Sequence, residues 1–351
     1  MPNAKTRIVA NIDPTPRGRA TQGGTVATAM QNRNSKQKAS GESQTGPVRG
    51  TKDALGFIMT QNDTQSSVFK VTGDHLNRLL KSGDRHKYDY GHAIVVSGPP
   101  GQSGAARLAA RGALRIGAGV VSVFCSEACK GENAARLDAI MVKTYREAQG
   151  FIDQLSTLKP SAICIGPNLG LDPENRQRLI DIVSLGVPLC LDADAITLVA
   201  QDPRPISAAM HPQVVMTPHE GELRRLIPKA FSQTTCRITL AQTAAQTLNC
   251  TVLFKGSDTI IARPNGDCTV VSSKPFAHAA WLATAGSGDV LSGMITGLLA
   301  KGFDAFDAAA LGAHLHLHCA ETIGPGLIAE DIPEALPAVL TRCPEMKNNL
   351  V

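Results

Sequence analysis

The sequence predicts an α/β domain built on a central, mostly parallel sheet with helices on both faces. From about Lys87 onward, short runs rich in Val, Ile and Leu alternate with alanine- and leucine-rich stretches of helical length. The short runs are apolar at consecutive positions, which is typical of strands buried on both faces, and helices between strands favour parallel pairing. With 351 residues, 43% of them hydrophobic, the chain is long enough to enclose such a core.

Buried strands are expected in this order: His92–Gly98, Gly119–Cys125, Ser161–Pro167, Val187–Asp194 and Gln213–His219. A further apolar run, "TVLF", leads directly into Lys255. In sheets of this kind, ligands bind beyond the carboxyl ends of the strands. Polar residues stand at several of these ends, and we expect them to share one site: Asp192, Asp194, Thr217, His219, Glu220, Glu222 and Lys255.

The segment Leu282–Gly293, "LATAGSGDVLSG", places glycines and one aspartate where a helix is expected to begin. Gly286 and Gly288 allow a sharp turn and a close approach of the backbone to a ligand. A helix that begins near Ser287 points its free amide hydrogens and positive dipole end into that space, which suits phosphate oxygens. Asp289 in the first turn is equally compatible with an ordinary helix start, so the turn alone leaves both interpretations open.

Residues 1–52 are predicted to form a disordered basic tail, because they contain no aromatic residue and show no helical or alternating apolar period. Residues 53–85 are expected to be a linker and lead-in, and residues 86–345 the folded domain. The low acidity and arginine content of the tail also resemble a transit peptide, and Met30 or Met59 is an alternative start. Both of these alternatives stay open.

The net charge of +5 comes from the tail, which holds nine Lys or Arg and two Asp or Glu, so the remaining chain is slightly acidic. This distribution argues against a nucleic-acid groove in the folded domain. The chain has no secretory signal and no stretch of eighteen apolar residues, so we expect a cytoplasmic protein that does not bind a membrane. The nine scattered cysteines are expected to be reduced core residues.

Two other glycine-rich segments do not match known phosphate-binding loops. "GPPGQSGAA" lacks the lysine of a Walker A loop, and "GAGVVS" lacks the last glycine of a dinucleotide-binding fingerprint. We therefore expect neither a P-loop nor a Rossmann site.

Seven segments, taken in order, resemble the motifs of NAD(P)H-hydrate dehydratases, a family with a ribokinase-like fold. They extend from about Val71 to Leu340. The segments are "HKYDYGHAIVVSGPPGQSGAARLAARGALRIGAGVVSV", "CIGPNLG", "PLCLDADAI", "VMTPHEGEL", "VLFKGSDTIIA", "WLATAGSGDVLSGMITGLLAKG" and "IAEDIPEALP". The resemblance implies repair of NADH and NADPH that have been hydrated at the nicotinamide ring (NADHX and NADPHX). ADP or ATP phosphorylates the new hydroxyl, phosphate leaves, and the double bond returns; Mg²⁺ is expected with the nucleotide.

The resemblance also implies roles for individual residues. Asp289 would accept the hydroxyl proton, and Gly286, Ser287 and Gly288 would form an anion hole for the moving phosphoryl group. The nucleotide would be held by Gly288 and by Lys255, Gly256, Ser257, Asp258 and Thr259. The substrate would be contacted by Ala105, Asn168, His219 and Asp289.

Magnesium is usually held by phosphate oxygens, waters and one or two carboxylates. The candidates at strand ends are Asp192, Asp194 and Glu222, although each of them could instead cap a helix or pair with a cation. His314 and His318 have a spacing that can bind a metal on a helix face, but no third ligand is evident nearby, so we expect them to pack.

The chain departs from the family pattern at Asn168, where "GPNLG" replaces "GPGLG". Asn tolerates a left-handed backbone, so we expect the turn to persist. Too few residues precede the matching region for the epimerase domain of many bacterial relatives, so a separate epimerase would serve the same substrates. A homo-oligomer, such as a tetramer, is expected. Two alternatives remain: a vitamin-precursor kinase of the same fold and a non-catalytic nucleotide-binding module.

Overall fold

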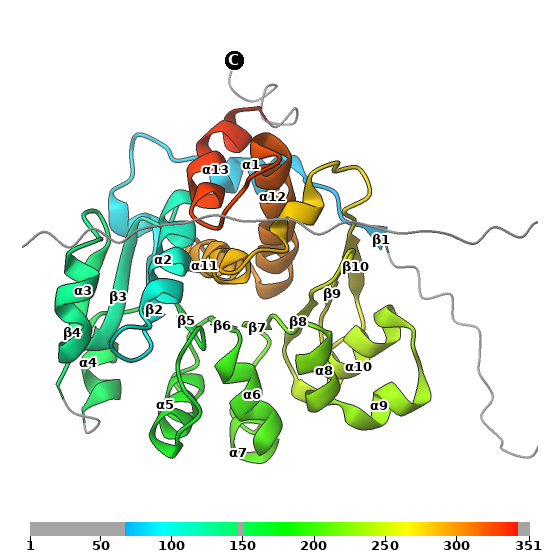
Figure 1. The fold of residues 1–351 in the computed structure, drawn as a ribbon, viewed down its shortest axis with the longest axis horizontal. Coiled ribbons are helices and arrows are strands. Elements are labelled where there is room, and N and C mark those ends of the chain that lie inside the picture. Colours follow the sequence, from blue (N-terminus) through cyan, green and yellow to red (C-terminus); the bar gives the residue numbers. More distant parts are fainter. Residues whose placement is uncertain (1–66, 147–149, 343–351) are drawn as a thin grey trace, which may run out of the picture. The chain divides into compact units, whose positions relative to one another are not determined.

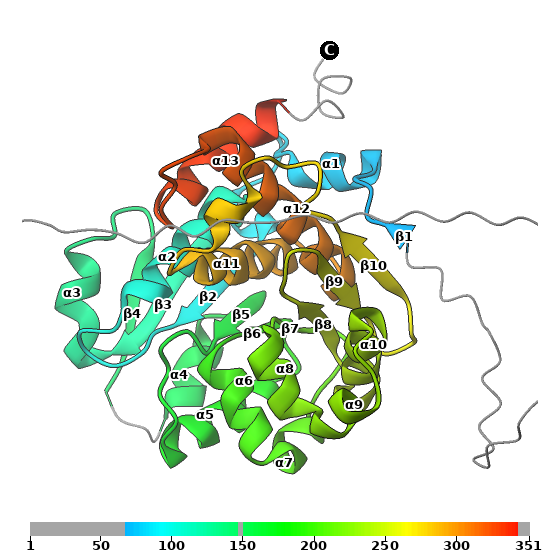
Figure 2. The ribbon, with the colours of Figure 1, turned by 45° about the vertical axis from the view of Figure 1, so that its right-hand side comes forward.

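The computed structural model describes residues 67–146 and 150–342, which lie within one compact unit, Asn62–Val351. The predicted tail falls outside the described residues. A central sheet lies between two layers of helices (Figures 1 and 2). Its strands are β1 (Ser67–Val68), β2 (His92–Val96), β3 (Val120–Ser126), β4 (Met141–Tyr145), β5 (Ala162–Ile165), β6 (Leu189–Leu191), β7 (Val214–Met216), β8 (Thr251–Phe254), β9 (Thr259–Ala262) and β10 (Cys268–Val271).

The strand order across the sheet is β1-β10-β9-β8-β7-β6-β5-β2-β3-β4. Strand β9 is antiparallel to β8 and β10, and the other neighbours are parallel, so the predicted mostly parallel sheet is confirmed. The carboxyl ends of β2, β5, β6, β7 and β8 therefore lie along one edge. The functional residues predicted from the sequence follow these ends.

One face of the sheet is covered by five helices: α1 (Gly73–Leu79), α2 (Gly104–Arg115), α11 (Ser287–Ala300), α12 (Ala305–Ile323) and α13 (Asp331–Arg342). The opposite face carries α4 (Phe151–Thr157), α5 (Pro173–Val183), α6 (Asp194–Gln201), α7 (Pro203–Ser207), α8 (Glu220–Leu226), α9 (Pro228–Gln233) and α10 (Arg237–Leu248). The short helix α3 (Lys130–Ala134) packs next to β3 and β4. In the described part of the chain, none of the helices combines the length and apolarity needed to cross a bilayer.

The sheet separates two hydrophobic cores because successive side chains of a strand point to opposite faces. In β2, Ala93 and Val95 join the core beneath α2 and α11, whereas Ile94 and Val96 join the core on the side of α4 to α10. Strands β5, β6 and β7 divide their residues in the same way. This burial on both faces explains why these strands are apolar at consecutive positions.

The central strands β2, β3, β5, β6, β7 and β8 confirm the strands predicted from the apolar runs, with ends that differ by at most a few residues. Strand β4, "MVKTY", was not predicted, because it is an edge strand whose first four residues are only half-buried and are not uniformly apolar. Elements β1 and α1 lie in the stretch expected to be linker and lead-in, and β1 pairs with β10. The domain boundaries themselves stay a prediction.

Helices α2 and α11 pack closely because glycines remove side chains from their interface. A Cβ atom placed on Gly293 of α11 would lie 1.9 Å from the carbonyl oxygen of Ala109 in α2. A Cβ on Gly297 would lie 2.7 Å from the carbonyl oxygen of Ala113. Because the contacted atoms belong to the backbone of α2, they cannot move away unless the whole helix moves. The small residues therefore fix where the first turn of α11 lies relative to α2.

We expect Gly293→Ala to destabilise the fold, because the added methyl group pushes α11 away from α2. Overpacking of this kind costs about 1–3 kcal/mol, and a contact with backbone places the cost near the upper end. Urea denaturation of the variant and the wild type measures the difference. The control is Gly131→Ala, which should be tolerated because Gly131 has open space around it and an ordinary φ. Gly302 is not a suitable control, because its positive φ disfavours any side chain. Equal stability of Gly293→Ala and the wild type would contradict the close-packing argument.

Candidate active site

The first turn of α11 begins as predicted, at Ser287, with Gly286 as the residue before it. Gly286 has φ of 88°, in the left-handed region that favours glycine. The Ser287 hydroxyl donates a hydrogen bond of 2.6 Å to the Leu282 carbonyl, which closes the turn. The Ser287 amide donates to the Thr284 carbonyl oxygen at 3.4 Å. The amides of Gly288 and Asp289, in the first turn of the helix, have no intrahelical carbonyl partner and are available to an anion.

His316 of α12 contacts the same turn and also lines the cavity beside it. Its Nε2 lies 3.1 Å from the Ser287 carbonyl oxygen. Burial lowers the pKa of His316 to about 4, so the ring is neutral near pH 7 and its Nε2–H donates to this carbonyl. His316 thus binds the carbonyl group of Ser287 and does not cover the amides of the first turn of α11.

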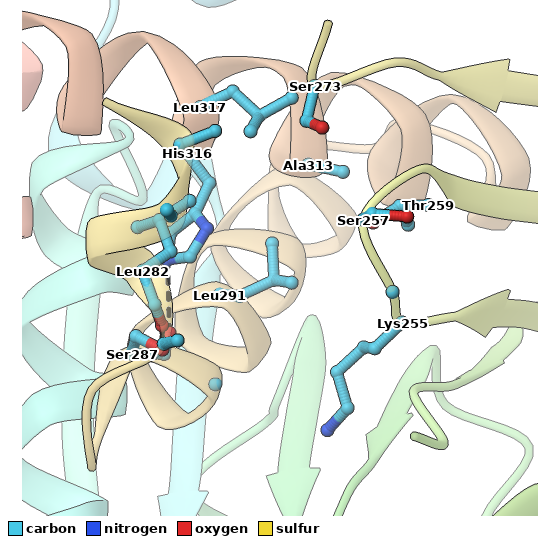
Figure 3. Close-up of a pocket in the computed structure, with 15 residues that line it drawn as sticks. Lys255, Ser257, Thr259, Ser273, Leu282, Ser287, Leu291, Ala313, His316 and Leu317 are labelled. Carbon is cyan, nitrogen blue, oxygen red and sulfur yellow. Dashed lines mark hydrogen bonds between the residues drawn. The ribbon is translucent and has the colours of Figure 1, made fainter. Parts of the chain in front are cut away.

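A cavity of about 420 Å³ opens in front of this turn (Figure 3). Its walls come from the start of α11, the short 3-10 helix Ala279–Leu282, helix α12 and the turn after β8. The predicted nucleotide residues Lys255, Gly256, Ser257, Thr259 and Gly288 all line it. Leu282, Leu291 and Leu317 add apolar surface on the other side. The structure therefore brings segments that are distant in the sequence to one cavity, which combines the predicted nucleotide residues with apolar surface.

Asp258 has a different position from the other predicted nucleotide residues. It is absent from the residues that line the cavity. Its Oδ1 accepts hydrogen bonds from the Ser272 hydroxyl at 2.8 Å and from the Ser273 amide at 3.1 Å. The carboxylate therefore joins the turn after β8 to the segment that follows β10. Any contribution to nucleotide binding would act through the shape of this turn.

Arg237, at the start of α10, is a residue of this site that the sequence reasoning missed. Its guanidinium lies 3.7 Å above the Phe254 ring and donates through Nη2 to the carbonyl oxygens of Lys255 at 3.0 Å and Asp258 at 3.4 Å. A Cβ on Gly256 would lie only 2.3 Å from Nη2. Arg237 therefore holds the backbone of the turn from beneath. No local pattern marks it, because it lies on a separate helix earlier in the chain.

We expect Arg237→Gln to weaken nucleotide binding about tenfold. The turn would lose its charge-assisted hydrogen bonds, and a hydrogen bond to a charged group typically contributes about 1.5–3 kcal/mol. Calorimetry with ADP measures the affinity. Arg204, at the surface on α7, is 94% exposed in its side chain and provides the matched control Arg204→Gln. Unchanged ADP affinity in Arg237→Gln would show that the turn keeps its shape without the guanidinium.

Beneath the first turn of α11, the buried carboxylate of Asp192 organises a polar network. Its Oδ1 accepts from Lys255 Nζ at 3.0 Å and from the Thr217 hydroxyl at 2.7 Å, and its Oδ2 accepts from the Ser292 hydroxyl at 2.6 Å. Burial favours the neutral acid, but the Lys255 ammonium and the two hydroxyl groups outweigh it and hold the pKa of Asp192 below its ordinary value. Asp192 therefore stays ionised and fixes the direction of Lys255.

Lys255 lies over the start of α11: a Cβ on Gly288 would lie 3.8 Å from its Nζ. Burial disfavours the ammonium form, yet the charges of Asp192 and Glu222 more than offset burial and raise the pKa of Lys255 above its ordinary value. A permanent positive charge thus stands beside the free amides of the turn. Together they form a positive surface that is suited to an anion and would need little rearrangement to bind one.

Asp289 follows this surface, in the first turn of α11. Burial, helped by the nearby charge of Asp192 and opposed by Lys255, raises the pKa of Asp289 to about 6. The carboxylate therefore ionises close to neutral pH, where it is a stronger base than an ordinary aspartate. It does not line the 420 Å³ cavity, and one of its oxygens lies 3.9 Å from the position that a Cβ on Gly286 would take.

Comparison with known proteins identifies the family. Residues 93–336 match the model of the NAD(P)H-hydrate dehydratase family. The "ADP-dependent (S)-NAD(P)H-hydrate dehydratase" of Neisseria meningitidis serogroup B is 31% identical over 76% of this chain and 95% of its own length. The chain belongs to the NAD(P)H-hydrate dehydratase family. The expected family and the ribokinase-like fold are both confirmed.

Other relatives of this family differ in length. The "Bifunctional NAD(P)H-hydrate repair enzyme Nnr" of Moorella thermoacetica is 33% identical over 80% of this chain, which spans 57% of that enzyme. The chain thus spans about half the length of the bifunctional relatives that it matches. A solved ADP/ATP-dependent NAD(P)H-hydrate dehydratase from Bacillus subtilis, co-crystallised with ATP and Mg²⁺, is 28% identical, with a TM-score of 0.63 over 79% of this chain and 99% of that one.

The residues that the dehydratase family implies for the substrate side lie at the carboxyl edge of the sheet. Asn168, after β5, has φ of 52°, which confirms that Asn maintains a left-handed turn in place of the family's glycine. Ala105 is buried in the first turn of α2. His219 follows β7, and its Nδ1 accepts from the amides of Gly221 and Glu222, so it caps α8. Its side chain is 56% exposed, and substrate contact by these three residues stays a prediction.

The carboxylates considered for Mg²⁺ are all engaged by protein groups. Asp192 binds Lys255 and two hydroxyl groups, Asp194 accepts from the Gly170 amide at 2.9 Å, and Glu222 accepts from the His219 amide at 2.8 Å. Within residues 67–146 and 150–342, no three His, Cys, Asp or Glu side chains are grouped to hold a metal. An all-protein magnesium cage therefore does not fit this site, and phosphate oxygens would have to supply most of the ligands.

Proposed function

We propose that this protein uses ADP, or ATP, to dehydrate NADHX and NADPHX. The observation that carries the proposal is the arrangement at the start of α11. Free amides and the Lys255 ammonium face the cavity, and the Asp289 carboxylate, with a pKa of about 6, stands in the same helical turn. In this arrangement, only a few backbone atoms lie between the surface that would bind an anion and the carboxylate that would act as a base. Phosphoryl transfer from a nucleotide to a hydroxyl group needs both at that spacing.

In the proposed reaction, the nucleotide occupies the 420 Å³ cavity with its terminal phosphate toward Gly288 and Lys255. The hydroxyl group of the hydrated ring lies on the side of Asp289. The hydroxyl oxygen forms a bond to the terminal phosphorus as the bond to the nucleotide breaks, and Asp289 takes the hydroxyl proton. The amides of the glycine turn stabilise the negative charge on the transferred group.

Elimination completes the proposed reaction. The ring nitrogen supplies its electron pair, the bond between the ring carbon and the phosphate oxygen breaks, and inorganic phosphate leaves. The neighbouring ring carbon then loses a proton, which restores the double bond of the reduced nicotinamide. Phosphorylation is the step that makes this elimination possible, because phosphate is a much better leaving group than hydroxide.

The nucleotide and metal requirements belong to the same proposal. We infer that ADP is the donor, which is supported by the name of the N. meningitidis relative. Mg²⁺ would accompany the nucleotide, as it does in the B. subtilis structure, and would neutralise part of its phosphate charge. A homo-oligomeric state and a separate epimerase acting on the same substrates are further parts of the proposal.

The proposal is tested by incubating the full chain with chemically prepared NADHX, Mg²⁺ and either ADP or ATP. Recovery of absorbance at the reduced-nicotinamide band, with release of one inorganic phosphate per molecule repaired, is the expected result. The same assay without nucleotide is the control. Phosphorylation of a vitamin-precursor alcohol, without recovery from either hydrate, would favour the small-molecule kinase. Nucleotide binding without any transfer would favour the binding module.

The turnover rate is expected to fall as the pH is lowered through about 6. The folded-state pKa of Asp289 is raised from 3.8 to about 6, so the carboxylate loses its charge over this range and can no longer accept a proton. A profile of kcat between pH 5 and 8 measures the midpoint. Because ADP also titrates near pH 6 to 7, ADP affinity at each pH should be measured in parallel. A kcat that stays constant down to pH 5 would contradict the proton-acceptor role.

A further inference from the structure

A second cavity, of about 350 Å³, lies on the outer side of α2 and is rich in arginine. We call it the arginine pocket and define it by the residues Gly104, Arg107, Leu108, Arg111, Arg136 and Glu330. Two of its arginines stand one helical turn apart on α2, and the third comes from the segment between α3 and β4. Side chains from three separate segments thus converge on this space.

Positive charge exceeds negative charge in the arginine pocket. Arg111 lies 3.6 Å from Glu334, which also pairs with Arg115 of the same helix. Arg107 has only a long hydrogen bond, 3.4 Å, to the Asn133 side chain. Among the described residues, neither Arg107 nor Arg136 forms an ion pair. Three guanidinium groups therefore share the pocket with the single carboxylate of Glu330.

Two acidic groups near the pocket are already engaged, one by protein donors other than arginine and the other by Arg111 and Arg115. Glu132 lies within electrostatic reach of Arg107, but its carboxylate accepts from the Gly101 amide and the Ser103 hydroxyl. Glu334 is shared between two arginines. Arg111 and Arg115 connect α2 to α13 through Glu334, whereas Arg107 and Arg136 form no ion pair with a described residue and keep donors free for a ligand. An anionic ligand would use their remaining donors.

The arginine pocket is next to the catalytic turn. A Cβ on Gly286 would lie 2.7 Å from Leu108 Cδ1, 2.9 Å from Ala329 Cβ and 3.9 Å from an Asp289 oxygen. Leu108 lines the pocket, and Ala329 precedes Glu330, which also lines it. Gly104, which also lines the pocket, precedes the predicted substrate residue Ala105. The pocket therefore flanks the side of the glycine turn that carries Asp289.

We propose that the arginine pocket binds the phosphate groups of the dinucleotide substrate. This inference rests on the proposed function, because the reacting ring must lie beside Asp289. In a nicotinamide dinucleotide the pyrophosphate is separated from that ring by one ribose. Planar guanidinium groups match phosphate oxygens in pairs, and one turn of α2 presents two of them in a row. The nucleotide donor occupies the other cavity, so the two sets of phosphates do not compete.

The first test compares two substrates in the variants Arg107→Gln and Arg136→Gln. One substrate is NADHX, and the other is the hydrated form of reduced nicotinamide riboside, which has the same ring and hydroxyl group but no phosphate. Each variant should raise the KM for NADHX about tenfold, because a charge-assisted contact is lost, while kcat stays within about twofold. The riboside should react with unchanged kcat/KM. An equal effect on both substrates, or no effect on either, would overturn the inference.

The control variant is Arg115→Gln, which makes the same change on the same helix outside the arginine pocket. It should leave the KM for NADHX unchanged. Arg107→Lys retains the charge and should recover part of the affinity. ADP affinity, which depends on the other cavity, shows that each variant is folded.

A second measurement separates this inference from the proposed function. Inorganic pyrophosphate is titrated into the full chain at saturating ADP, with calorimetry as the readout. Binding to the wild type and to Arg115→Gln, with affinity lowered about tenfold in Arg107→Gln and Arg136→Gln, supports the pocket even if no hydrate is turned over. Identical binding in all four proteins, or no binding to the wild type, refutes it. Failure of the wild type to repair either hydrate refutes only the proposed function.

Discussion

Asp289→Asn is expected to lower the rate of NADHX repair about a thousandfold while ADP still binds. The amide has the size of the carboxylate but cannot accept the hydroxyl proton, and general-base catalysis contributes about 10²–10⁴ to such rates. Single-turnover assays with the purified variant measure the loss, and calorimetry measures ADP affinity. Asp153 stands in the first turn of α4, is exposed, and provides the control Asp153→Asn, which should retain full activity.

Asp289→Asn is expected to be more stable than the wild type at neutral pH, although its activity is lower. Because the folded-state pKa of Asp289 is about 6 and its ordinary value is 3.8, ionisation of this group costs stability in the folded protein. This cost is absent below pH 3.8, grows between 3.8 and 6, and is complete above 6. Asp289→Asn should therefore have a higher Tm than the wild type at pH 7.5 and a similar Tm near pH 4. A lower Tm at pH 7.5 would leave loss of folding as an explanation for the lost activity.

Lys255→Met is expected to cause the largest combined loss of stability and nucleotide binding. The buried Asp192 carboxylate would keep its two hydroxyl partners but lose the ammonium group 3.0 Å away. Removing one member of a buried pair typically costs about 3–5 kcal/mol, and we expect about 2–3 kcal/mol because the Lys255 side chain is 25% exposed. ADP affinity should fall at least tenfold, since the positive charge beside the glycine turn is gone.

The pH dependence and a double variant test the cause of that loss. Asp192 has a depressed pKa in the wild type, so its pair with Lys255 stabilises the fold above pH 3.8, and this contribution disappears as the pH falls through the depressed pKa. The difference between Lys255→Met and the wild type should therefore shrink in acid. Adding Asp192→Asn should recover most of the stability without restoring ADP affinity. Lys229→Met, at the exposed surface of α9, is the control. Equal stability of Lys255→Met and the wild type at pH 7.5 would contradict the network.

The sequence-based predictions were most successful where the signal is local. Runs of consecutive apolar residues predicted the central strands, because burial on both faces excludes polar side chains from every position. The helix start at Ser287 was predicted for a similar reason, since few residues other than glycine adopt the φ of 88° at Gly286. Edge strand β4 was not predicted, because solvent on one side permits Lys and Thr there.

The electrostatic part of the site could not be derived from the sequence in the same way. Asp192 and Lys255 were both singled out as strand-end residues, but nothing local indicates that they pair with each other or that Asp192 faces α11. Asp192 was also considered as a metal ligand; in the structure its carboxylate accepts hydrogen bonds from protein donors, and the metal role stays a prediction. His219 was assigned to the substrate from the family resemblance, and in the structure its ring caps α8.

The sequence by itself determined the fold class, the family and the position of the glycine turn, because each depends on residue types at short and fixed spacings. Only the tertiary structure decided which polar groups face one another: Arg237 at the turn after β8, His316 at the Ser287 carbonyl, and Lys255 between Asp192 and α11. Interactions of this kind join residues that are distant in the chain, and their strength depends on burial and on distance. Those two quantities exist only once the sheet and its helices have packed.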